Sequence, residues 1–194
     1  MDKRKRIVAA AEQSFQLYGY KGTTMVQVAK LADVAKGTIY TFFKNKEDLF
    51  DEILENLIDT LKRKAEAAID PTDTFFNNLH RAIYDILAFR KQHQLTLKLS
   101  QEVRDIGTGK AQAALDKVER AILAFIERHI VKAIEKGEII PCDPRKTAFI
   151  MLKIYIALVF EWEEKNEQSL SEEEIADLFD QFIVLGLKPR NAMP

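Results

Sequence analysis

The sequence predicts an all-α protein. Apolar residues recur at helical spacing along the chain, sustained strand-like alternation is absent, and helix start and stop signals recur at intervals. With 194 residues, 47% of them hydrophobic and 30% charged, the chain can bury a substantial core. It contains no apolar run of about 18 residues, so no membrane span is expected. We expect a three-helix head, a connecting fourth helix and a five-helix body.

The first two helices are marked by local signals. Residues 2–18 carry a helical apolar stripe, and Gly19 is a typical helix-terminating residue. Thr24, followed three positions later by Gln27, forms a capping box that predicts a second helix reaching about Ala32. The next three residues then make a turn, short enough to hold the following helix at a steep angle.

Residues 36–47 contain a short helix, its end and the start of the fourth helix. Ile39, Phe42 and Phe43 share one face at helical spacing, which predicts an inward face. Asn45 is the expected cap of the fourth helix, which extends from residue 46 into the 60s. The face opposite the apolar one carries Lys36, Thr38, Tyr40 and Thr41.

The body helices are expected over about residues 71–90, 91–105, 110–136, 144–165 and 172–187. Asp70-Pro71 and Asp143-Pro144 each resemble a cap followed by a first-position proline. Ser171 with Glu174 forms a second capping box. These signals divide the chain beyond the fourth helix into five further helices, consistent with a bundle.

The charge is divided unevenly along the chain. Residues 1–46 hold nine Lys or Arg side chains and three Asp or Glu, giving +6, whereas the remaining 148 residues hold 20 basic and 27 acidic side chains, giving −7. A basic head on an acidic body indicates a nucleic-acid contact at one end. The basic run 3–6 has two open interpretations, a solvated charged terminus or a DNA contact in its own right.

Three kinds of residue in the 36–47 stretch suit a duplex. Gly37 costs about 1 kcal/mol relative to alanine inside a helix, which indicates that an external group approaches the backbone. Lys36 and Lys46 sit at helix starts, where a bound phosphate would offset the unfavourable helix dipole. Hydroxyl groups at the remaining polar positions can reach bases or phosphate oxygens.

Residues 7–50 resemble the DNA-binding head of the TetR family of bacterial transcriptional regulators. The resemblance rests on Ala-Ala-Glu-Gln-Ser-Phe-Gln-Leu-Tyr-Gly-Tyr at 10–20, Thr-Thr-Met-Val-Gln-Val-Ala at 23–29 and Gly-Thr-Ile-Tyr-Thr-Phe-Phe-Lys-Asn-Lys-Glu-Asp-Leu at 37–49. It implies a helix-turn-helix, with Thr24 and Tyr40 on phosphates, three side chains near bases, and a lysine clamping the DNA backbone at the fourth helix. The implied DNA-binding set is Thr24, Lys36, Gly37, Thr38, Tyr40, Thr41 and Lys46.

Four positions depart from the family pattern. Val26 and Ala35 replace polar residues, and the second of these removes a capping hydroxyl from the third helix. Phe42 stands where Tyr or His is common and is expected to pack, while Asp33 occupies a turn position where Gly is common.

The resemblance divides the chain into a DNA-binding domain, 1–46, and an effector-binding and dimerisation domain, 47–194. Residues 144–165 are apolar on nearly every side, so a second subunit is expected to cover one face. The predicted dimer interface comprises Tyr155, Val159, Trp162, Leu178, Phe179 and Phe182. An apolar pocket for a lipophilic effector is expected from Leu79, Ile83, Leu87, Leu99, Val103, Ile122, Phe125 and Ile154.

Other chemistry has little support. His80, His93 and His129 lack metal-ligand spacing, and Gly107–Lys110 lacks the full phosphate-loop pattern. Cys142 is interpreted as an incidental reduced thiol, with a redox switch as the alternative. We expect no cofactor, no metal and no catalysis. The amino terminus lacks a secretory signal, so a cytoplasmic protein is expected.

The sequence therefore predicts a homodimeric, ligand-responsive repressor that binds a near-palindromic DNA operator. Two alternatives remain open. A protein of the same fold could answer to a protein partner or act architecturally, with a filled core. A helical enzyme with an incidental helix-turn-helix would need convergent ionisable groups in the body.

Overall fold

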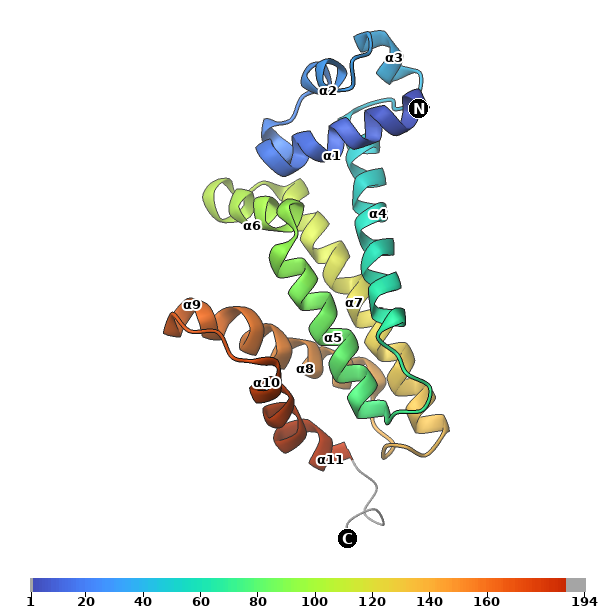
Figure 1. Ribbon diagram of the computed structural model, residues 1–194, viewed down its shortest axis with the longest axis vertical. Helices are drawn as coiled ribbons and strands as arrows, with labels where there is room; N and C mark the ends of the chain where they lie inside the picture. The colour runs from blue at the N-terminus through green and yellow to red at the C-terminus, as the bar shows by residue number, and fades with distance from the viewer. Residues whose placement is uncertain (1, 188–194) are drawn as a thin grey trace. The chain divides into compact units, whose positions relative to one another are not determined.

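The computed structural model describes residues 2–187, and within that range every regular element is helical, which confirms the predicted all-α class. Figure 1 shows the elements in chain order. They are α1 (Lys3–Gly22), α2 (Met25–Leu31), α3 (Lys36–Tyr40), α4 (Lys46–Ala67), α5 (Phe75–Gln92), α6 (Gln94–Ile106), α7 (Gly109–Glu135), α8 (Pro144–Ile156), η1 (Ala157–Glu161), α9 (Trp162–Asn166), α10 (Glu172–Phe179), η2 (Asp180–Val184) and α11 (Leu185–Leu187).

The last two long helices are each interrupted by a π-helical turn. Elements α8, η1 and α9 follow one another without a break, as do α10, η2 and α11, so the predicted helices over 144–165 and 172–187 are confirmed. Their start signals act as expected. The Asp143 carboxylate accepts from the Lys146 amide (3.1 Å), and Ser171 and Glu174 cap each other reciprocally.

The chain packs into two compact units. The first combines the residues up to Thr60 with Gln92–Glu119, and the second combines Leu61–Lys91 with the residues from Arg120 onward. Helices α4 and α7 contribute to both units. The sequence-based boundary between residues 46 and 47 stays a prediction.

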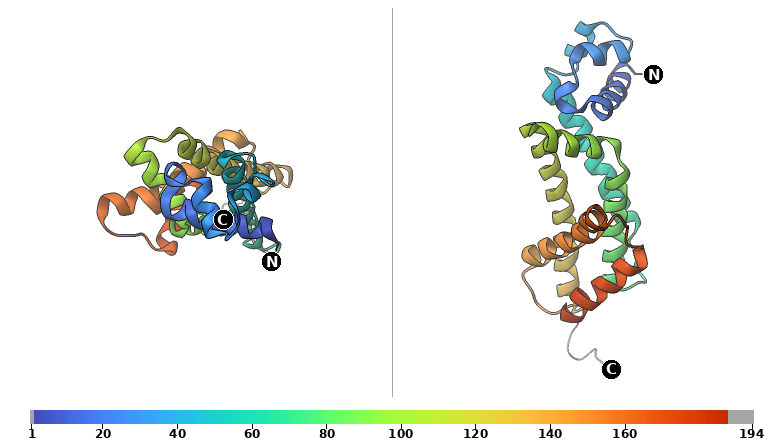
Figure 2. Two further views of the ribbon diagram at one scale, coloured as in Figure 1. Left: turned by 90° about the horizontal axis from the view of Figure 1, so that it is seen from above. Right: turned by 90° about the vertical axis from the view of Figure 1, so that its left-hand side faces the viewer.

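In the first unit, α1 packs against α2 and α6, and α2 packs against α3. The two views of Figure 2 follow these helices from different sides. Phe15 and Phe50 are almost completely buried, and both rings contact the ring of Tyr20. The centroid of the Phe50 ring lies 4.9 Å from that of Phe15 and 4.9 Å from that of Tyr20, edge-on in both cases. This aromatic cluster anchors α1 to α4, because large rings contribute most to the burial of apolar surface.

Helix α1 is broken at Gly19, where the sequence predicted its end. Gly19 breaks the helical backbone with φ 73° and ψ −175°, as expected of a terminating glycine, but the chain resumes a helical turn that reaches Gly22. A positive φ of this size is readily adopted only by glycine. The predicted end of the regular helix at residue 18 is therefore confirmed, whereas the helical turn that follows the break was not predicted.

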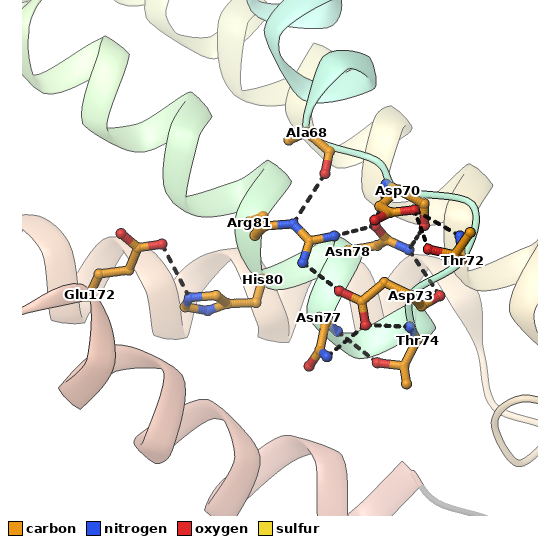
Figure 3. A network of polar contacts seen from close by, with 10 residues as sticks. All are labelled: Ala68, Asp70, Thr72, Asp73, Thr74, Asn77, Asn78, His80, Arg81 and Glu172. Atoms are coloured by element: carbon orange, nitrogen blue, oxygen red, sulfur yellow. Dashed lines mark hydrogen bonds and ion pairs between the residues drawn. The ribbon is translucent and has the colours of Figure 1, made fainter.

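The predicted start of α5 at Asp70-Pro71 is also wrong, because α5 begins at Phe75. The Asp70 carboxylate accepts from the amide (2.8 Å) and hydroxyl (2.7 Å) of Thr72, and these bonds lower its pKa. It therefore forms a side-chain turn rather than a helix cap. Figure 3 shows how Arg81 then ties Asp73 and Asn78 to this connection.

The second unit contains a buried polar contact between α5 and α8. Tyr155 is fully buried, and its hydroxyl lies 2.6 Å from Nδ1 of His80. Burial is the main cause that lowers the pKa of His80, although Glu172 at 3.9 Å acts in the opposite direction. The imidazole is therefore mostly neutral near pH 7, and its approach to Glu172, drawn in Figure 3, becomes an ion pair only when His80 is protonated.

The lowered pKa of His80 predicts a loss of stability on acidification. Between the folded and the unfolded pKa the unfolded chain binds more protons, so the free energy of unfolding falls as the pH drops below about 6.5. Urea unfolding at pH 7.5 and 5.5 should show this fall. His80→Gln, which can still bond to the Tyr155 hydroxyl, should reduce the pH-dependent part; an equal fall in the variant would contradict the assignment.

Candidate nucleic-acid interface

Helices α2 and α3 form a helix-turn-helix whose first helix is fixed by Thr24. The Thr24 hydroxyl accepts from the Gln27 amide (3.3 Å), and the Thr24 amide donates to Oε1 of Gln27 (2.8 Å), which confirms the predicted capping box. Between the helices, Asp33 adopts φ 51°. Aspartate visits this left-handed region more readily than most residues.

The turn is held from α1 by Arg6. The guanidinium donates to the carbonyl oxygens of Ala32 (2.6 Å) and Asp33 (2.9 Å), and to the Asp33 carboxylate (3.2 Å). Arg4 pairs with Glu52 of α4. Two of the four basic residues at 3–6 therefore make contacts inside the chain, Arg6 with the turn and Arg4 with α4. Neither of the two interpretations of this run had included such contacts.

Helix α3 presents a mixed face. Ile39 and Phe43 are buried as predicted, but Phe42 is 41% exposed, so the prediction that it packs inward is wrong. The reason is that α3 ends at Tyr40, and Phe42 lies in the turn beyond it. Ala35 caps α3 without a side-chain hydrogen bond. The first amides of this helix are consequently left without a capping side chain.

The polar residues predicted for DNA differ in their exposure. Lys36, Tyr40 and Thr41 are exposed, whereas Thr38 is half-buried. The Thr41 hydroxyl donates to the Thr38 carbonyl (2.7 Å), which leaves the methyl group and the oxygen lone pairs of Thr41 available. Hydroxyl and ammonium groups of this kind are those that contact phosphates and base edges.

Gly37 lies in open space. A Cβ atom built there would meet nothing within 4 Å, and the backbone φ of this glycine lies outside the positive region. Neither packing nor conformation within the described chain requires glycine at this position. The missing side chain instead leaves the backbone of α3 accessible from outside.

Lys46, at the start of α4, is turned toward the end of α1. Its ammonium donates to the carbonyl oxygens of Tyr20 (2.9 Å) and Thr23 (3.1 Å) and lies 4.3 Å from the centroid of the Tyr20 ring. An ammonium has three N–H groups, so one is left for another acceptor. Asn45 caps α4 as predicted, accepting from the Asp48 amide (2.8 Å).

Tyr20 connects three helices. Its hydroxyl donates to Glu47 of α4 (2.6 Å), and its amide donates to Glu102 of α6 (2.6 Å). Burial, followed by the bond to Glu47, raises the pKa of Tyr20, while the same bond lowers the pKa of Glu47. The sequence reasoning missed Glu102, because no local pattern links residues that are 82 positions apart.

The predicted dimer residues fall into two groups. Tyr155, Phe179 and Val159 are buried within the second unit, the first two with ring centroids 5.0 Å apart. Trp162 and Phe182 are exposed, the latter by 67%, and Leu178 is half-buried. Only the second group faces away from the core of its own chain.

Six of the eight predicted pocket residues belong to the second unit, and Leu99 and Val103 belong to the first. Val103 and Ile154 are half-buried and the others are buried. Leu79 borders a cavity of about 300 Å³ together with His129 and Lys132. A second cavity, of about 830 Å³, lies between α7 and α8 and is bordered by Leu123, Phe149, Ile150, Arg120 and Arg145 among others.

Within residues 2–187, no group of three or more His, Cys, Asp or Glu side chains is arranged to hold a metal ion. In the same range, no helix has both the length and the apolar character needed to cross a membrane.

A helix-turn-helix with an exposed polar second helix defines a DNA-binding protein, and comparison with known proteins agrees. The family model of the tetR bacterial regulatory proteins matches residues 7–53. The helix-turn-helix-type transcriptional regulator YhgD of Bacillus subtilis (strain 168) is 53% identical over 187 residues, covering 96% of this chain and 97% of the relative. The chain belongs to the TetR family of transcriptional regulators. It is thus a regulator, and the alternative of a helical enzyme is set aside.

More distant relatives share the fold or part of the sequence. The fatty acid metabolism regulator protein of Bacillus subtilis (strain 168) is 27% identical over 140 residues, or 71% of each chain. The fatty acid degradation regulator FadR of Bacillus halodurans superposes with a TM-score of 0.66 at 20% identity, over 93% of this chain and 94% of its own. AibR, solved with isovaleryl coenzyme A and operator DNA, has a TM-score of 0.59 at 23% identity, over 92% and 96%.

Proposed function

We propose that this protein is a cytoplasmic, homodimeric one-component repressor that binds a near-palindromic operator and releases it when a lipophilic effector binds. The observation that carries the DNA-binding part is the open backbone at Gly37, flanked by exposed Lys36 and Tyr40. Glycine at this position lowers helix stability, and no contact within the described chain requires it. Its presence fits a DNA groove that approaches the backbone of α3 closely.

The contact set of the proposal follows from exposure and chemistry. Lys36, Thr38 and Thr41 approach base edges, while Thr24, Tyr40 and the third N–H of Lys46 approach phosphates. Gly37, which has no side chain, leaves room for the duplex to approach the backbone of α3. The net positive charge of residues 1–46 supports this docking, because phosphate neutralisation supplies much of the affinity for DNA.

The homodimer is supported by exposed apolar side chains on the last two long helices. Leaving the exposed side chains of Trp162 and Phe182 in water would be unfavourable, and Leu178 precedes Phe182 by four residues in the same continuous helix. In this proposal, the interface residues Tyr155, Val159 and Phe179 are buried within their own subunit and pack beneath the exposed ones. A twofold axis would place two recognition helices about 34–36 Å apart, on successive major grooves.

The effector proposal combines the cavities with the relatives. The cavity between α7 and α8 has apolar walls at Leu123, Phe149 and Ile150, which suit an acyl chain. Arg120 and Arg145 at its border suit an anionic group, and Glu127 and Asp143 also line it. The cavity near Leu79 has a mixed lining of apolar and charged side chains. Two relatives are named for fatty acid metabolism or degradation, and AibR was solved with an acyl coenzyme A. An acyl coenzyme A or a fatty acid is therefore the effector class to test.

The test selects operator fragments from the organism's genomic DNA with the purified protein and then adds candidate effectors. Palmitoyl coenzyme A, palmitate and free coenzyme A are compared for thermal shift and for release of the selected duplex. Release by the first or second compound, but not by the third, supports the proposal. Selection of a specific duplex with no response to any lipophilic compound would favour control by a protein partner, and unspecific binding would favour an architectural role.

Tyr40→Phe removes only the phenolic hydroxyl from the exposed face of α3. If that hydroxyl donates to a phosphate oxygen, operator affinity should fall by about threefold to tenfold, which corresponds to one hydrogen bond of about 1 kcal/mol. Fluorescence anisotropy with the selected duplex measures this change. Tyr84→Phe, on α5, is the matched control and should bind as the wild type does; equal affinity of both variants would remove Tyr40 from the contact set.

A further inference from the structure

The end of α1 is held by a carboxylate from α6. Oε2 of Glu102 accepts from the Tyr20 amide (2.6 Å), and Oε1 accepts from the Lys21 amide (3.0 Å). Glu102 is only 6% exposed. A buried carboxylate that accepts two backbone N–H groups makes strong, charge-assisted hydrogen bonds. The helical turn that follows the break at Gly19 is thus capped by a residue from far along the chain.

Gly19 is shaped to receive this carboxylate. Its φ of 73° disfavours any residue with a side chain, and a Cβ atom at this position would lie 2.2 Å from Oε2 of Glu102. Conformation and space therefore both require glycine here. The break in α1 and the Glu102 side chain form one structural feature.

Residues 19–23, which Glu102 holds, also contact or adjoin the side chains proposed to bind DNA. Lys46 binds the carbonyl oxygens of Tyr20 and Thr23, and the Thr23 hydroxyl donates to the Gly19 carbonyl (2.8 Å). The next residue, Thr24, caps α2. Through these bonds, the starts of α2 and α4 both depend on the position of residues 19–23.

We infer that Glu102 is a positioning residue for operator recognition, which acts through the Tyr20 and Lys21 amides on Lys46 and Thr24. The inference rests on the proposed function, since it concerns the same DNA-binding face. Operator affinity then depends on a side chain of α6, although α6 supplies none of the proposed DNA contacts.

The test compares Glu102→Ala and Glu102→Gln with Asp105→Asn, a charge-matched control at an exposed position of the same helix. For Glu102→Ala we expect operator affinity to fall about tenfold and the salt slope of binding to fall by roughly one, because one phosphate contact is lost. Glu102→Gln keeps one acceptor oxygen and should fall between Glu102→Ala and the wild type. Asp105→Asn should match the wild type.

Backbone hydrogen exchange gives a readout that does not depend on DNA. The Tyr20 and Lys21 amides should lose protection in Glu102→Ala, whereas the hydrogen-bonded amides of residues 8–16, inside α1, should keep theirs. If the wild type selects no duplex, the proposed function fails while this capping role is still measured. A lowered melting temperature with unchanged affinity per folded molecule and an unchanged salt slope would overturn the inference.

A second variant guards against simple misfolding. Gly19→Ala should displace the carboxylate and reproduce the loss of affinity of Glu102→Ala. In the double variant the steric conflict is gone. Its loss of binding free energy should therefore be smaller than the sum of the losses of the two single variants, as expected for residues in contact. Fully additive losses would contradict a joint role.

Discussion

Lys46→Met is expected to lower operator affinity by about tenfold or more and the salt slope by roughly one. Methionine keeps the apolar stem of lysine but removes the ammonium that bonds to the Tyr20 and Thr23 carbonyls. The free energy of unfolding should also fall by about 1–2 kcal/mol, because two partly buried, charge-assisted hydrogen bonds are lost. Anisotropy over a series of salt concentrations, with urea unfolding, measures both effects.

The matched control for this change is Lys62→Met, at an exposed position of α4 in the second unit. It removes the same charge from the chain and should leave the operator affinity and the salt slope close to those of the wild type. If Lys46→Met lost stability but kept the salt slope, Lys46 would hold the head together without contacting a phosphate. The proposed docking of α4 on the DNA backbone would then be wrong.

Gly37→Ala is expected to change stability and affinity in opposite directions. Alanine should stabilise the free protein by about 0.5–1 kcal/mol, because it favours the helix and its Cβ meets no atom of the described chain. The same methyl group should lower operator affinity by about tenfold or more, since it would lie where the duplex approaches α3.

Gly109→Ala is the control, because Gly109 also has open space around it and begins α7 outside the proposed contact set. It should raise stability or leave it unchanged, with no effect on operator binding. A Gly37→Ala variant that bound the operator as tightly as the wild type would show that no DNA group approaches this point. The glycine would then lack the role that carries the proposed function.

Local signals predicted most of the fold. Thr24, Asn45 and Ser171 cap the helices that their spacing indicated, because a cap requires only the next three or four residues. The wrong prediction of a helix start at Asp70 has a related cause. The same carboxylate can cap a helix or close a side-chain turn, and the choice depends on Asn78 and Arg81, which hold the connection from α5.

The interior of the head was less predictable. Arg6 looked like one member of a charged terminus, yet it fixes the turn beside Asp33. No sequence pattern marked Glu102, yet its side chain is buried and accepts a hydrogen bond from the Tyr20 amide. Both roles depend on contacts between distant parts of the chain, which helical periodicity does not encode.

The exposed face of α3 and the starts of α2 and α4 form the proposed operator-binding surface. Its most direct test is anisotropy with the selected duplex and a triple variant, Lys36→Ala, Gly37→Ala and Tyr40→Phe, all exposed positions of α3. We expect the triple variant to stay as helical and at least nearly as stable as the wild type, but to lose specific binding to the level of an unrelated duplex. Wild-type affinity and specificity in this variant would show that the exposed face of α3 does not bind the operator.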